Sequence, residues 1–90
     1  MTPEAFRHRH LARVCWSNPF ASDDLLIVRA LLRPMPEVLQ DAVAAFGLPR
    51  LEKAWQELQA QGADDPEVQR SRPHTTRILA SLSRSLRHAD

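Results

Sequence analysis

Apolar residues recur along this chain at the three- and four-residue intervals of amphipathic helices, with proline and glycine between the periodic stretches. Clusters of β-branched residues, which are typical of strands, are absent. The pattern predicts an all-α fold: a compact bundle of about five short helices in a single domain over residues 1–90. The first helix is expected over residues 2–16, with Thr2 as its cap and Pro3 in its first turn.

The second helix is the most hydrophobic element, and it is expected over residues 23–33. Ser22 is a strong capping residue, and Pro34 ends the helix because a residue before proline avoids the helical conformation. Apolar residues cover roughly two-thirds of its circumference, at the 100° per residue of an α-helix. Such a helix must be central in the bundle or must present one flank to a partner.

Two further helices are expected over residues 36–47 and 49–62. They are expected to form a tight pair, because the link between them consists only of Gly47 and Leu48. Gly47 is predicted to be left-handed. The polar stretch 62–72 is predicted to be a flexible loop or at most one helical turn, and Pro73 is predicted to start the last helix.

Length and composition favour a small soluble protein. With 90 residues, of which 43% are hydrophobic and 26% charged, the chain has room for one globular domain. Its single cysteine fits a reducing compartment. No apolar run reaches the length of a signal peptide or a membrane span, so we expect a cytoplasmic protein.

The net charge of +1 conceals an uneven distribution. Residues 1–18 carry three arginines against one glutamate, and residues 70–90 carry five arginines against one aspartate. Residues 19–69 carry four basic residues against nine acids. Such a pattern indicates either that the basic ends pair with the acidic middle or that the protein has a charged partner.

No set of side chains predicts catalysis. His8 and His10 are two residues apart and point in different directions on a helix, so surface or packing roles are expected for both. Cys15 lies near the apolar side of its helix and is expected in the core. Both glycines are assigned to helix ends, which leaves no phosphate-binding loop. We therefore expect a non-enzymatic protein with no metal and no cofactor.

Other side chains are candidates for binding. Arg77, Arg84 and Arg87 lie on one face of the last helix, as a solubilising surface or as a positive surface for the acidic groups of a partner. Trp16 stands at a helix end beside a turn, as a binding residue or as a core residue.

A DNA-binding regulator is the alternative interpretation, because the two helices joined at Gly47 superficially resemble a helix-turn-helix. Their link is shorter than the usual turn, and the outward residues of the second helix sum to zero charge, whereas insertion into a major groove needs positive charge. A subunit of a larger enzyme is a third possibility.

Two segments carry a family resemblance: residues 44–58, AAFGLPRLEKAWQEL, and residues 72–79, RPHTTRIL. They resemble short bacterial antitoxin-type proteins that are encoded next to nucleotidyltransferase toxins of the abortive-infection type, over roughly residues 22–86. The C-terminal part of that family often reads Pro-x-x-Glu-Arg. Here Thr76 stands where the acid would be, which leaves the last helix more basic.

The resemblance implies a function in toxin neutralisation. An antitoxin of this kind would bind its partner tightly in a non-covalent complex, and the toxins carry paired carboxylates and a divalent metal. Arg77, Arg84 and Arg87 are then expected to face that acidic cleft, while apolar residues of the second helix, among them Leu26 and Val28, anchor the interface. Oligomeric state does not follow from the sequence.

Overall fold

The protein is an all-α bundle, as the periodicity predicts. A computed structural model describes residues 1–14 and 20–88, the last two of these without their side chains. Within these residues the chain forms helices and connecting turns and no strand. The helices are α1 (Pro3–Val14), α2 (Asp23–Leu32), α3 (Pro36–Phe46), α4 (Leu48–Gln61) and α5 (Pro66–His88).

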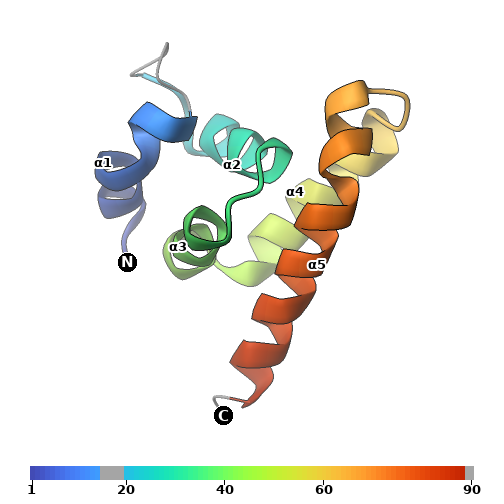
Figure 1. Ribbon diagram of the computed structural model, residues 1–90. Coiled ribbons are helices and arrows are strands. Elements are labelled where there is room, and N and C mark those ends of the chain that lie inside the picture. The colour runs from blue at the N-terminus through green and yellow to red at the C-terminus, as the bar shows by residue number, and fades with distance from the viewer. Residues whose placement is uncertain (15–19, 89–90) are drawn as a thin grey trace.

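Helices α2 and α3 form the centre of the molecule. Each of them contacts all four other helices, whereas α1 packs only on α2 and α3. Helices α4 and α5 pack on each other and cover the opposite side, so that the central pair lies between α1 and the α4–α5 pair (Figure 1). The strongly apolar second helix is therefore central in the bundle. This was one of its two expected arrangements, the other being a flank presented to a partner.

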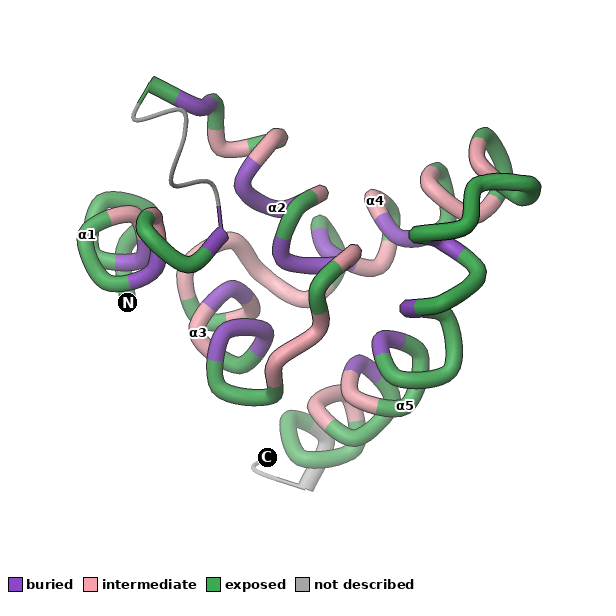
Figure 2. The backbone as a smooth tube through the Cα atoms, turned by 45° about the horizontal axis from the view of Figure 1, so that its top comes forward, coloured by how far each residue is buried: buried purple, intermediate pink, exposed green. Residues whose placement is uncertain are grey.

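The core lies where the inner faces of the five helices meet. In Figure 2 the buried positions of α2 and α3 face inward, while the last turns of α5 show only half-buried and exposed positions. This burial follows the apolar stripes in the sequence. The largest fully buried side chains belong to Phe6, Leu26, Ile27, Leu31, Val38, Leu39, Leu51, Val68 and Thr75.

The predicted capping residues occupy their places. The Thr2 hydroxyl accepts a hydrogen bond from the Ala5 amide at 3.1 Å, and the Ser22 hydroxyl accepts one from Leu25 at 3.2 Å. Gly47 has the predicted positive φ, at 91°, but its ψ of 140° lies outside the left-handed helical region. This single residue ends α3 and precedes α4 directly.

The predicted loop over residues 62–72 is wrong from Pro66 onward, because α5 begins there and continues through Pro73. The Asp65 carboxylate accepts a 2.8 Å hydrogen bond from the Glu67 amide, which caps the new helix start. Proline within a helix is unfavourable by about 3 kcal/mol, so the first turns of α5 need compensation from packing. Val68 supplies part of it, since its side chain is buried in the core.

Residues 15–19, which include Cys15 and Trp16, lie outside the described residues, so the predicted end of the first helix is not covered. In the part of the chain that is described, no helix is both long enough and apolar enough to cross a membrane.

Candidate functional site: the basic face of α5

The arginines of α1 form ion pairs with acids of the same chain. Each one reaches a carboxylate on α2 or α3, on side chains that are mostly part-exposed. The pairs are Arg7–Asp23 (3.0 Å), Arg9–Asp41 (3.4 Å) and Arg13–Glu37 (3.6 Å). The basic N-terminal end therefore pairs with the acidic middle, which was one of the two explanations for the charge pattern.

The arginines of α5 are different. Within the described residues, Arg70, Arg72, Arg77 and Arg84 have no carboxylate partner, and the guanidinium of Arg77 meets only the His74 ring, at 3.4 Å. All four are exposed. Glu67, in the first turn, is the one acid among the described side chains of this helix. The four described arginines of the basic C-terminal end are thus not neutralised by acids elsewhere in the described residues.

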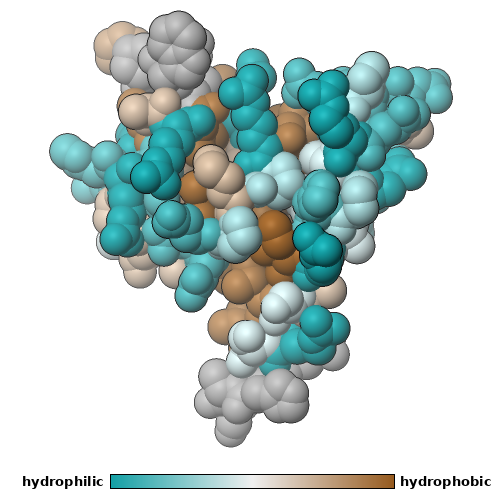
Figure 3. Space-filling model, viewed as in Figure 1, coloured by the Kyte–Doolittle hydropathy of each residue, from teal (hydrophilic) through white to brown (hydrophobic). Residues whose placement is uncertain are grey.

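Arg77 and Arg84 border a groove between α5 and the start of α3. The groove holds about 540 Å³ and is open to solvent. Figure 3 shows apolar side chains gathered between α3 and α5, with hydrophilic ones on either side. The lining residues are Pro34, Pro36 and Gln40 on one side and Arg77, Ile78, Ser81, Leu82 and Arg84 on the other. Both charged residues of the groove are therefore positive.

The apolar stripe of α5 continues beyond the bundle. A helix of 23 residues is about 35 Å long, whereas the ten residues of α2 span only about 15 Å. The end of α5 consequently projects past its neighbours (Figure 1). Ile78 and Leu82 are half-buried, and Leu86 is 47% exposed. The groove thus opens onto a row of incompletely covered apolar side chains.

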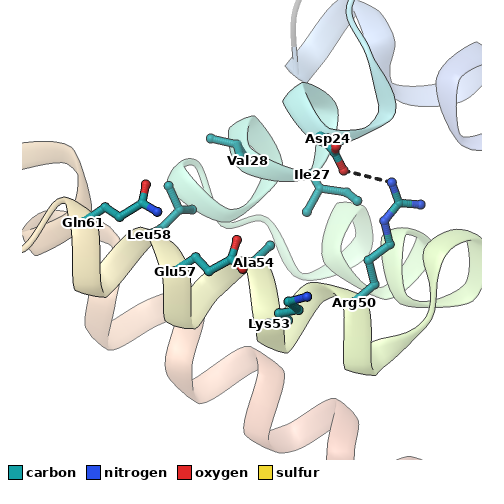
Figure 4. A pocket seen from close by; sticks show the side chains of 9 residues that line it. All are labelled: Asp24, Ile27, Val28, Arg50, Lys53, Ala54, Glu57, Leu58 and Gln61. Atoms are coloured by element: carbon teal, nitrogen blue, oxygen red, sulfur yellow. Dashed lines mark hydrogen bonds and ion pairs between the residues drawn. The ribbon is translucent and has the colours of Figure 1, made fainter.

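A second groove separates α2 from α4 and has mixed charge. Ile27 and Val28 from α2 face Ala54 and Leu58 from α4 across about 420 Å³ (Figure 4). The remaining lining residues are Asp24, Arg50, Lys53, Glu57 and Gln61, and a 2.9 Å ion pair joins Asp24 to Arg50. Two acids and two bases thus compensate each other here, so this groove has no preference for the charge of a ligand.

The buried histidine has a structural role. His10 is 3% exposed, packs with its ring centroid 5.0 Å from that of Phe6, and places Nε2 2.7 Å from a carboxylate oxygen of Asp41. Nε2–H donates to Asp41, because a carboxylate only accepts, and Nδ1 is buried without a hydrogen-bond partner. His8 is exposed. His10 thus packs in the core and His8 lies at the surface, which are the two roles expected. Within the described residues, no three side chains of His, Cys, Asp or Glu lie close enough together to hold a metal ion.

The structure separates the four predicted binding residues whose side chains it describes. Arg77 and Arg84 lie together on the α3–α5 groove, and Val28 lines the α2–α4 groove. Leu26 is 0% exposed in the core, so its side chain is not available to a partner in this structure. Trp16 and the side chain of Arg87 lie outside the described residues.

Sequence reasoning identified the arginines but missed the opposite wall of their groove. Pro34 and Pro36 were interpreted only as a helix stop and a helix start. Their contribution depends on the packing of α5 against α3, which no local pattern encodes. The only available signal was the repeated proline, which produces a rigid exposed bend.

The helix pair α3–α4 has little positive charge to offer DNA. Arg50, at the start of α4, is paired with Asp24 and lies 5.3 Å from the centroid of the Phe46 ring. Of the remaining charged residues of α4, Lys53 is offset by Glu52 and Glu57. The helix that would read the bases is therefore without net positive charge, in agreement with the sequence argument.

Comparison with family models, with curated proteins and with solved structures finds no significant match for this chain. The resemblance to antitoxin-type proteins is consequently carried by the two sequence segments alone. The most distinctive surface of the described residues combines the exposed arginines of α5 with the groove beside them.

Proposed function

We propose that this chain is a non-enzymatic protein-binding module that holds an acidic partner protein against α5. The observation that carries the proposal is the contrast between two sets of arginines. Those of α1 pair with acids of the same chain, whereas those of α5 have no carboxylate partner within the described residues. A surface of one sign attracts a partner of the opposite sign and orients it during association.

The apolar row beside these arginines supports the same function. Charge alone gives weak and salt-sensitive binding, and stable interfaces also bury apolar side chains at their centre. Ile78, Leu82 and Leu86 provide such side chains next to Arg77 and Arg84. The surface therefore combines an apolar centre with a positive rim.

The resemblance suggests the class of partner. We propose that the chain acts as a cytoplasmic antitoxin and neutralises a nucleotidyltransferase toxin by direct binding. Carboxylates that hold a divalent metal give such an enzyme an acidic cleft, and exposed guanidinium groups suit carboxylates because they can form paired hydrogen bonds. The arginines of α5 would occupy that cleft in the complex.

Co-expression with a nucleotidyltransferase toxin of the class that the resemblance implies tests the proposal. We expect the two proteins to co-purify as a stoichiometric complex, and we expect the chain to suppress nucleotide transfer by the enzyme. Arg77→Glu should weaken the complex about tenfold or more, because it replaces attraction by repulsion. Lys53→Glu makes the same change of charge on α4, outside the basic surface, and should have an effect below twofold.

Two results would contradict the proposal. Binding that is indifferent to Arg77→Glu would remove α5 from the interface. Sequence-specific binding of duplex DNA by the pure chain, with no affinity for the enzyme, would favour the regulator instead. DNA binding of that kind would show a steep decrease of affinity with salt concentration.

A further inference from the structure

The geometry points to the form of the partner: we infer that the α3–α5 groove binds an amphipathic helix that carries two carboxylates seven residues apart. The inference rests on the proposed function, because it specifies what an acidic protein would place on α5. It concerns the groove lined by Pro34, Pro36, Ile78, Leu82 and the two arginines.

The spacing of the arginines sets the spacing of the carboxylates. Arg77 and Arg84 are seven residues apart on one continuous helix. Seven residues correspond to about 10 Å along the axis and to nearly two full turns, so the two guanidinium groups leave the helix in almost the same direction. A partner helix aligned with α5 meets both of them only if its own acids have this spacing.

The floor of the groove sets the apolar positions. Ile78 and Leu82 are four residues apart and form one row on α5, and Leu86 extends this row toward the exposed end. Packing of two helices interdigitates such rows. The partner helix therefore needs apolar side chains between its two acids, over about three turns.

The walls of the groove favour a helix over an extended peptide. Extended peptides bind mainly through main-chain hydrogen bonds to an exposed strand edge, and the part of the chain that the structure describes has no strand. Pro34 and Pro36 also lack an amide N–H to donate. An amphipathic helix satisfies its own main-chain groups and needs only side-chain contacts, as in other helix-in-groove complexes.

A second copy of this chain offers no helix with the inferred spacing among its described residues. Among the described helices, no two acids of one helix are seven residues apart: the pair in α3 is four apart, and the pair in α4 is five apart. Homodimers therefore cannot meet both arginines with one of these helices. The occupant that we infer is therefore a helix of a different protein.

Synthetic helical peptides test the inference on the full chain. The first peptide carries two glutamates seven residues apart with leucines between them. The second has the same composition with its glutamates five apart, which places them on different sides of the helix. In fluorescence anisotropy at low salt, we expect the first peptide to bind about tenfold more tightly than the second. Amide chemical-shift changes should be largest around Ile78 and Leu82.

A charge swap provides the specific control. Arg77→Glu/Arg84→Glu should lose affinity for the first peptide and gain affinity for a version with lysines in place of the glutamates. Circular dichroism identifies any variant that fails to fold, and Arg84→Gln then provides the milder test.

The outcomes separate this inference from the proposed function. Equal affinity for the two glutamate peptides, or no binding of either, would overturn the helix with its seven-residue spacing. If Arg77→Glu still weakens the complex with the nucleotidyltransferase, the proposed function survives that failure. If it leaves that complex unchanged, both proposals fail.

Discussion

The hydroxyl of Thr75 donates a 2.7 Å hydrogen bond to the main-chain carbonyl of Leu31, across 44 residues of sequence. Leu31 lies in the last turn of α2, where carbonyls have no partner within their own helix. Thr75 is fully buried, so water cannot replace this bond. One side chain of α5 thus completes the end of the central helix and fixes the position of α5 beside it.

Thr75→Val should therefore destabilise the protein. The substitution keeps the shape of the side chain but leaves the Leu31 carbonyl without its donor, at about 1–3 kcal/mol of unfolding free energy. Urea unfolding followed by circular dichroism measures the change. Thr75→Ser is the matched control: it keeps the hydroxyl and should lose less stability than Thr75→Val. The reverse order would show that the methyl group, and not the hydrogen bond, holds α5 in place.

Gly47 joins α3 to α4 in a conformation that side chains disfavour. At φ 91° and ψ 140° it lies near the region that essentially only glycine adopts. A Cβ atom would meet nothing closer than Pro49 Cδ at 4.0 Å, so the backbone alone decides the outcome. We expect Gly47→Ala and Gly47→Asn both to lower the unfolding free energy by about 1–3 kcal/mol. Tolerance of Asn alone would indicate that the junction relaxes to the left-handed helical region.

Local patterns predicted the parts of this fold that local interactions determine. The cap at Ser22 and the positive φ of Gly47 depend on a few neighbouring residues, and both were predicted correctly. The start of α5 was missed because Pro73 was interpreted as a helix start, although prolines at both 66 and 73 are compatible with a first turn. Val68 and Ser71, which lie between the two prolines, are buried, and their burial depends on packing against distant helices.

The candidate site follows the same rule. Periodicity placed Arg77 and Arg84 on one face of a helix, and they do lie on one groove. The pairing of the α1 arginines with acids of α2 and α3 needs the tertiary arrangement. The sequence alone does not distinguish the two basic ends of the chain. Within the described residues, the arginines of α1 have carboxylate partners and those of α5 have none.

The true start of α5 can be tested with two adjacent aspartates. Asp65 caps the helix through its 2.8 Å bond to the Glu67 amide, whereas no side-chain bond involves Asp64 within the described residues. Asp65→Ala should reduce stability by about 1 kcal/mol, and Asp64→Ala should be nearly neutral. The same urea unfolding experiment compares them. Equal effects would place the helix start further along the chain, closer to Pro73.

Leu26 and Val28 lie two residues apart on α2 and should behave very differently. Leu26 has no exposed surface, so Leu26→Ala leaves a cavity and should lower the unfolding free energy by about 2–5 kcal/mol. That is a large part of the total of about 5–15 kcal/mol expected for a domain, and the variant should be close to unfolding at 37 °C.

Val28 is only half-buried at the edge of the α2–α4 groove, and alanine is the better helix former. Val28→Ala should therefore change the unfolding free energy by about 1 kcal/mol or less. Thermal unfolding of both variants, together with binding to the nucleotidyltransferase, separates their roles. Reduced binding by a fully folded Val28→Ala variant would extend the interface from α5 to the α2–α4 groove. Unchanged binding would leave Val28 outside the interface. Leu26 can influence a partner only through the stability of the core, because its side chain has no exposed surface.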